Sequence, residues 1–240
     1  MRSKKKTKEK KSAAIEARQA AYRGLILEAA ERVFATKGFD GAKIKDVADA
    51  AGLALGTVYV LFPSKRDVFA AVHAQRGEAL VARAAAAAIG APSPLAALCR
   101  MQRAAFDFYA AHPAYLRMHL FSGTAWAAPR LDVEEERRIY EQGMGALVGL
   151  FEQAAARGEL IGDEPPTSCA RMCVAIVQVL LAEWEAESFA TPGADVASRF
   201  ERYVMRALGR PVMEAPASAR GARTQSPPAS ELRARRAASR

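Results

Sequence analysis

The sequence predicts an all-α protein in which a small N-terminal three-helix unit is followed by a larger helical domain. Apolar residues recur at helical spacing along most of the chain, and no segment shows the alternation expected of a strand. Gly and Pro residues separate the periodic segments. With 240 residues, the chain is long enough to bury a sizeable core.

The first three helices are predicted from apolar spacing and from glycines that end them. A first helix is expected over about residues 13–36, and Gly38 ends it because glycine adopts positive φ without strain. A second helix is expected over residues 44–51 and ends at Gly52, and a third follows over residues 55–62. The apolar stripes of the first two helices are Ile26, Ala30, Val33 and Phe34, and Ile44, Val47, Ala48 and Ala51.

The later helices are predicted from a capping signal and from breaks that contain proline. Ser64, with Asp67 three residues later, is typical of a helix start, and this fourth helix is expected to continue to about Ile89. GAPSP, HisPro, AlaPro, GlyAspGluProPro and ThrProGly are the breaks. Further helices are predicted over residues 94–111, 113–123, 133–157, 167–189 and 195–208.

Two short helices joined by a glycine turn and braced by a longer one form a helix-turn-helix, whose second helix enters the major groove of DNA. A helical wheel of residues 55–62 places Val58 and Phe62 inward, with Leu55 near them. Gly56, Thr57 and Val60 point outward and Tyr59 lies at the flank. The alternative is a buried helical hairpin within an all-α protein.

The outward face of this helix is largely apolar, yet apolar side chains read DNA through thymine methyl groups. Gly56 lets a backbone approach closely, and affinity can come from phosphate contacts by helix-start amides and lysines. The candidate DNA-binding residues are Lys43, Lys45, Leu55, Gly56, Thr57, Tyr59, Val60 and Lys65.

Residues 24–70 resemble the DNA-binding domain of the TetR family of one-component helix-turn-helix transcriptional regulators. The matching pattern is LEAAxxxFAxxGF, then IxDVAxAAG, then GTVYxxFPSKxxVF. The resemblance implies that Gly56 and Tyr59 approach bases or phosphates, that Thr57 and Lys65 hold phosphates, and that Val58 and Phe62 are core residues. The sequence departs from the family at two places, with Ala42 where Thr or Ser is frequent and Leu61 where His or Tyr is frequent. Shape readout or thymine contact is therefore expected to carry more of the selectivity.

The net charge of +9 is concentrated at the two ends of the chain. Residues 1–23 hold nine Lys or Arg against two Glu, and residues 209–240 hold seven Arg against two Glu. A basic arm beside a DNA-binding unit favours phosphate contact, and a merely solvated tail is the alternative. We expect a partly disordered basic arm over 1–22, a helix-turn-helix domain over 23–70, an effector-binding and dimerisation domain over 71–208, and a disordered basic tail over 209–240.

The stretch MCVAIVQVLLA, residues 172–182, is apolar on nearly all sides and so requires burial on all sides. The following helix is amphipathic, and two such helices from each of two subunits would form a four-helix interface, as the family resemblance also implies. A monomeric core hairpin is the alternative. The candidate interface residues are Met172, Ile176, Val179, Leu180, Phe200, Tyr203 and Val204. A homodimer would place two recognition helices about 34–36 Å apart on palindromic double-stranded DNA.

Aromatic residues of the middle helices suggest a pocket for a largely apolar small-molecule effector, although plain core packing is the alternative for each. The candidates are Phe106, Tyr109, Tyr115, Met118, His119, Phe121, Trp126 and Trp184. His112 and His119 are expected at the surface or in the core. Cys169 and Cys173 supply only half of a metal site and are expected in the core, so no cofactor or metal is predicted.

Several classes of protein are disfavoured. No apolar run reaches the roughly 18 residues of a membrane span, and no apolar segment of a signal peptide follows the basic start, so a cytoplasmic protein without membrane contact is expected. Catalytic motifs are missing, which argues against an enzyme. The expected function is a ligand-responsive repressor released from a palindromic operator, with activation also possible. The alternatives are a sequence-tolerant DNA-coating protein that uses its basic tails, and a helical metalloenzyme with zinc on Cys169, Cys173 and a histidine.

Overall fold

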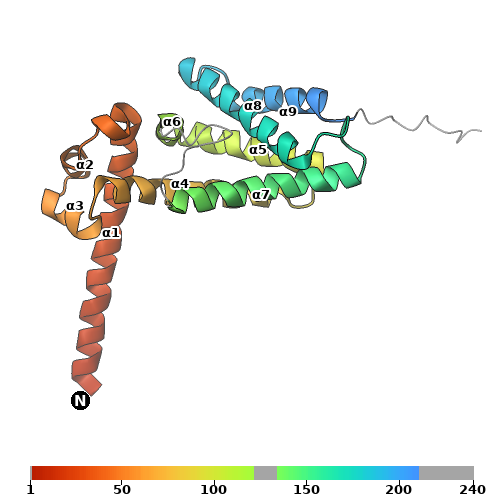
Figure 1. The fold of residues 1–240 in the computed structure, drawn as a ribbon. Coiled ribbons are helices and arrows are strands. Elements are labelled where there is room, and N and C mark those ends of the chain that lie inside the picture. The colour runs from red at the N-terminus through yellow and green to blue at the C-terminus, as the bar shows by residue number, and fades with distance from the viewer. Residues whose placement is uncertain (1, 122–133, 211–240) are drawn as a thin grey trace, which may run out of the picture. The chain divides into compact units, whose positions relative to one another are not determined.

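The computed structural model describes residues 2–121 and 134–210, and over these residues the protein is all-α, as predicted (Figure 1). An isolated antiparallel bridge joins Leu160 to Gly209. The helices are α1 Arg2–Gly41, α2 Ile44–Ala51, α3 Leu55–Leu61, α4 Lys65–Ala88, α5 Pro94–Ala111, α6 Pro113–Phe121, α7 Glu134–Ala156, α8 Pro166–Ala186 and α9 Gly193–Ala207.

Helix α1 is longer than the sequence pattern predicts, because it begins at Arg2 rather than near Ala13. The added residues are mostly Lys and contain neither Gly nor Pro, so their helix propensity is high although they carry no apolar stripe. The predicted end at Gly38 is confirmed by its φ of 68° and ψ of 174°, which break the regular helix there. The basic arm therefore continues directly into the first helix of the three-helix unit, residues 23–70.

The three-helix unit folds around residues of α1, α2 and α3. Gly52 ends α2 with a left-handed φ of 66°, and the Leu53 amide donates to the Ala48 carbonyl at 3.0 Å. The side chains that fill this part of the core are Ile26, Ala30, Phe34, Ile44, Val47, Val58 and Phe62. The tight turn places α3 across α1 and α2, with one side buried and the other in solvent.

Helix α4 leads from the three-helix unit into the larger helical domain (Figure 1). Ser64 caps it as predicted, because its hydroxyl oxygen accepts the Asp67 amide at 3.2 Å. Farther along, Arg76 Nε donates to the buried Glu31 carboxylate at 2.7 Å and ties α4 to α1. Val68, Phe69 and Val72 belong to a hydrophobic core that continues from the three-helix unit into the later helices.

The larger domain is built by α5–α9. Helix α5 packs on α4 and α9, α7 packs on α8 and α5, and α6 packs mainly on α1. Helix α8 is, by length and composition alone, long and apolar enough to cross a membrane, a test that the core helix of a soluble protein also passes. One stripe of α8, which includes Leu180, Leu181 and Trp184, lies in the core.

Candidate functional site

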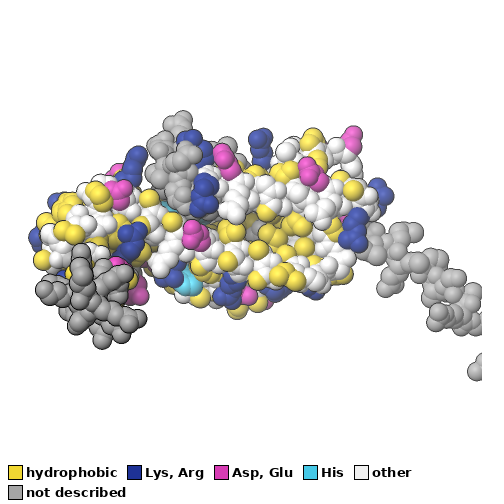
Figure 2. All heavy atoms as spheres, turned by 90° about the horizontal axis from the view of Figure 1, so that it is seen from below, with side chains coloured by type: hydrophobic (Ala, Val, Ile, Leu, Met, Phe, Trp, Pro, Cys, Tyr) yellow, Lys and Arg dark blue, Asp and Glu magenta, His cyan; other side chains and the backbone are white. Residues whose placement is uncertain are grey.

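Helix α3 presents an exposed face of largely apolar side chains. Val60 is 78% exposed, Tyr59 49% and Leu55 40%, while Val58 and Phe62 are almost fully buried. The wheel is therefore correct for Val58, Phe62, Tyr59 and Val60. It is wrong for Leu55, because residues four apart share a helix face and Leu55 lies with Tyr59. Figure 2 shows hydrophobic side chains interspersed with Lys and Arg and with Asp and Glu on the face of the molecule seen from below.

The start of α3 is open toward solvent. Its N-cap, Ala54, makes no side-chain capping bond. The Thr57 amide donates to the Ala54 carbonyl at 2.9 Å, which leaves the Leu55 and Gly56 amides at the open end of the helix. A Cβ added at Gly56 would meet nothing within 4 Å, so the chain's own packing does not require glycine at this position. Thr57 is half-buried beside it. Free amides at a helix start are suited to bind an anion such as phosphate.

The three candidate lysines differ in what their side chains contact. Lys43 is exposed, and its backbone amide donates to the Asp46 carboxylate at 3.0 Å. Lys45 is paired with Asp49 at 2.8 Å, and this hydrogen bond raises the pKa of Lys45. Both side chains remain at the surface, where phosphate can reach them.

Lys65 has a different role from the predicted phosphate contact. Its ammonium group donates to the backbone carbonyls of Phe39 at 2.6 Å, Ala42 at 3.0 Å and Asp40 at 3.3 Å. It also lies 4.5 Å from the centre of the Phe39 ring. An ammonium group has three donors, and all three are used to hold the turn between α1 and α2.

Arg23 is a basic residue beside α3 that the sequence analysis did not select. Its guanidinium lies 4.4 Å from the centre of the Phe62 ring, at the end of α3. The available signal was an arginine on the first helix three residues before Ile26, at the edge of the apolar stripe. The structure thus adds one cation to the surroundings of α3 and assigns another, Lys65, to the fold.

The effector-pocket candidates whose side chains the structure describes do not form one wall. Tyr109, Tyr115 and His119 contact one another with ring centroids 5.9–6.2 Å apart, whereas Phe106 packs against Trp184 and Phe200 elsewhere in the core. Phe106, Tyr109, Tyr115, Met118 and Trp184 are all buried. The Phe121 side chain and Trp126 lie outside the described residues.

His73 on α4 joins the first of these groups and was missed by the sequence analysis. It is buried, and its Nε2 atom has no hydrogen-bond partner. Burial lowers the pKa of His73 to about 3 and the pKa of His119 to about 4. The sequence signal was a polar residue on the same helix face as Val68, Phe69 and Val72.

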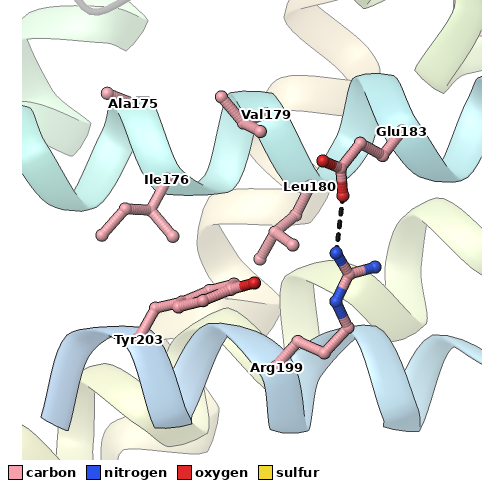
Figure 3. Close-up of a pocket in the computed structure, with 7 residues that line it drawn as sticks. All are labelled: Ala175, Ile176, Val179, Leu180, Glu183, Arg199 and Tyr203. Carbon is pink, nitrogen blue, oxygen red and sulfur yellow. Dashed lines mark hydrogen bonds and ion pairs between the residues drawn. The ribbon is translucent and has the colours of Figure 1, made fainter. Parts of the chain in front are cut away.

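Helices α8 and α9 form an exposed, largely apolar groove of about 330 Å³ (Figure 3). Ala175, Ile176, Val179, Leu180 and Tyr203 line it, and an ion pair between Glu183 and Arg199 at 2.6 Å closes one end.

Four of the seven candidate interface residues keep surface available for a partner. Val179 is 53% exposed, Tyr203 47% and Met172 39%, and Ile176 is half-buried. Leu180, Phe200 and Val204 differ from the expectation, because they are almost fully buried in the chain's own core, and of these three only Leu180 borders the groove.

Two cysteines of α8 are core residues, as expected, whereas Cys99 on α5 is half-buried. Cys169 and Cys173 are buried, and burial raises the pKa of the Cys173 thiol. Within residues 2–121 and 134–210, no group of three or more His, Cys, Asp or Glu side chains could hold a metal ion.

Comparisons with known proteins point to the same part of the chain. Residues 26–72 match the family described as "Bacterial regulatory proteins, tetR family". The HTH-type transcriptional repressor BepR of Brucella suis biovar 1 (strain 1330) is 27% identical over 176 residues, which cover 70% of this chain and 82% of BepR.

Two solved structures share the fold. The ketosteroid transcriptional regulator KstR2 of Mycobacterium tuberculosis has a TM-score of 0.66 at 20% identity and covers 78% of this chain and 95% of its own. FadR of Bacillus subtilis, in complex with stearoyl-CoA, has a TM-score of 0.65 at 16% identity and covers 75% of this chain and 96% of its own.

Proposed function

Because the chain belongs to the TetR family of bacterial transcriptional regulators, we propose that it is a repressor that binds an operator through α3 and is released by a small molecule. The family consists of transcription factors that carry out no catalysis. The observation that carries the proposal is the exposed face of α3 within a matched helix-turn-helix. A protein that acts on genomic DNA in a bacterium works in the cytoplasm.

Base contact is assigned to the exposed apolar side of α3. Tyr59 and Val60 contact base edges, including thymine methyl groups, while the open space at Gly56 admits the DNA backbone. The Leu55 and Gly56 amides at the start of α3, together with Lys43 and Lys45, contact phosphates. The base contacts therefore determine sequence preference, and the phosphate contacts position the protein on the DNA.

A homodimer formed through α8 and α9 supplies the second recognition helix. Val179 and Tyr203 are large apolar side chains that one chain leaves exposed beside a groove, and a second copy would cover them. A two-fold symmetric dimer matches a palindromic operator. Val179→Glu would place two carboxylates at the interface, so sedimentation analysis should find a monomer. Ile89→Glu, at a 79% exposed site directly after the end of α4, is the control that should remain dimeric.

The effector acts through α4 and α6. Helix α4 is continuous from the three-helix unit into the larger domain, and α6 packs on α1, so a ligand among these helices displaces the three-helix unit. A coupling free energy of about 1–3 kcal/mol would reduce operator affinity roughly 5–150-fold. The effector is a largely apolar small molecule, consistent with the buried aromatic candidates.

A binding selection from random duplex DNA at physiological salt tests this function. Wild-type protein should recover one palindrome, and Tyr59→Ala should bind it at least tenfold more weakly while remaining folded and dimeric. Ile89→Ala removes another exposed apolar side chain outside the three-helix unit and should bind normally.

Two results of this selection would contradict the proposal. Recovery of no motif despite tight binding would favour the sequence-tolerant DNA-coating alternative. Unchanged affinity of Tyr59→Ala would refute the orientation of α3 on DNA.

A further inference from the structure

His73 is a histidine on α4 that lies inside the protein with an unpaired hydrogen-bonding atom. Its residue exposure is 6%, and Nε2 has no partner. A buried polar atom without a partner destabilises the folded protein, so its presence requires an explanation such as a bound molecule that supplies the missing bond. Leu, Phe or Met would fill the same space without that loss, so packing alone does not explain a histidine here.

The described rings that contact His73 are uncharged aromatic side chains. The Phe69 ring lies 4.6 Å away on α4, the Tyr115 ring 5.7 Å and the His119 ring 6.4 Å away on α6, all measured between centroids. Tyr109 of α5 contacts the same two α6 rings at 6.1 and 5.9 Å. Burial keeps both histidines neutral at physiological pH.

The charged residue of α4 nearest to His73 in the sequence among the described ion pairs, Arg76, is already paired with a carboxylate of this chain. Arg76, one turn beyond His73, is bound to Glu31 of α1 at 2.7 Å, so its charge is directed to that carboxylate. A carboxylate or phosphate placed beside His73 would therefore meet neutral rings rather than a cation, and burying an uncompensated charge is very costly. A neutral ligand is the one that these surroundings favour.

We propose that His73, together with Tyr109, Tyr115 and His119, forms a site for a neutral hydroxyl-bearing aromatic molecule of the phenol class, whose hydroxyl group bonds to His73 Nε2. A hydroxyl group both donates and accepts, so it pairs with Nε2 in either tautomer of the neutral imidazole. The aromatic rings supply the apolar, edge-and-face contacts that an aromatic ligand prefers. This inference rests on the proposed effector control and specifies its ligand class and its polar contact.

The position of the site explains how occupancy would reach DNA. The rings around His73 are already in contact, so a ligand must displace His73 or α6 to enter. Phe69, which touches His73, also packs on Phe34 at 5.1 Å and on Phe39 at 5.0 Å, both in the three-helix unit. A displacement of His73 is thereby transmitted through two ring contacts to the helices that orient α3.

The test is direct binding of three probes to the full-length, DNA-free protein: phenol, benzene and benzoate. Calorimetry gives the affinities, and ¹⁵N NMR of labelled histidine side chains reports hydrogen bonding at Nε2. Phenol should bind about tenfold more tightly than benzene, which corresponds to about 1.4 kcal/mol. Binding should shift the nitrogen resonance of His73 and leave that of His112 unchanged, since His112 Nδ1 is bonded to the Phe108 carbonyl at 2.8 Å.

Two variants at His73 and one control identify the contact. His73→Phe keeps a ring but removes the hydrogen bond, so the preference for phenol over benzene should disappear. His73→Gln keeps a polar group and should retain a part of the preference, which provides a second measurement if the Phe variant folds poorly. His112→Phe, on a histidine outside the cluster, should bind phenol like the wild type.

Several results would overturn the site. These are equal binding of phenol and benzene to the wild type, tighter binding of benzoate than of phenol, an unchanged preference in His73→Phe, or no phenol binding at millimolar concentration. Operator affinity is measured separately with and without phenol. Binding through His73 with unchanged operator affinity would support the site and contradict the effector control in the proposed function.

Discussion

Replacing Lys65 with Met distinguishes a structural lysine from a phosphate contact. The variant keeps a long apolar stem but removes three ammonium donors from the carbonyls of Phe39, Asp40 and Ala42. Hydrogen bonds to a charged group contribute about 1.5–3 kcal/mol each, but they are not additive, and the exposed Asp40 carbonyl can bind water instead. Loss of the cation–π contact with Phe39 adds about 0.5–1 kcal/mol.

The free energy of unfolding should therefore fall by about 3 kcal/mol, which lowers the Tm of a protein of this size by about 6–12 °C. Urea and thermal unfolding measure this effect. The salt dependence of operator binding measures the other role, because losing one phosphate contact reduces the slope of log K against log salt by about 0.9. Lys65→Met should leave that slope unchanged at a temperature where the variant is folded.

Lys43→Met is the matched control, since Lys43 is an exposed lysine at the start of α2. It should reduce the salt slope by about 0.9 and change the free energy of unfolding by less than about 0.5 kcal/mol. The assignment of Lys65 to the fold would be refuted by a stable Lys65→Met protein whose salt slope has fallen.

Three further predictions concern the core. Gln178→Leu removes a buried side-chain oxygen that has no hydrogen-bond partner, so it should raise the free energy of unfolding by about 1 kcal/mol; a lower Tm would contradict this. Arg76→Met leaves the Glu31 carboxylate buried without its cation, so it should cost about 3 kcal/mol in urea unfolding, and adding Glu31→Gln should recover much of the loss. Below pH 6.5 His73 and His119 are protonated in the unfolded chain but stay neutral in the folded protein, because burial lowers their pKa values to about 3 and 4. Stability should therefore be fully present above pH 6.5 and fall toward pH 4 by up to about 1.4 kcal/mol per pH unit for each histidine. His73→Phe should fall less steeply than the wild type, and an equally steep fall in this variant would contradict the role of His73.

The apolar composition of α3 is compatible with binding an anion because the helix divides its tasks between two faces. Val58 and Phe62 anchor it in the core, and the exposed Tyr59 and Val60 are suited to base edges rather than to phosphates. The phosphates are then contacted by backbone amides at the start of α3 and by lysines outside α3. This division predicts that side-chain changes on α3 alter specificity more than they alter the salt slope.

The sequence by itself determined the helices and the turns between them. Helical spacing, the glycines at positions 38 and 52, and the cap of Ser64 are local signals whose meaning does not depend on distant residues, and each of these elements is found where it was expected. The orientation of α3 was also predictable, since a helix buries its most apolar stripe. The extension of α1 to Arg2 was missed because a polar helix has no stripe to reveal it.

Only the tertiary structure decided which side chains share a neighbourhood. Lys65 looked like a phosphate ligand, but a turn 23–26 residues earlier in the chain supplies its acceptors. His73 was not selected from the sequence, and only the fold brings the Tyr115 and His119 rings of α6 beside it. Leu180 and Phe200 looked like interface residues, yet their own chain covers them. In each case the deciding contacts join segments far apart in sequence. Such contacts do not produce a periodic pattern in the sequence around either residue.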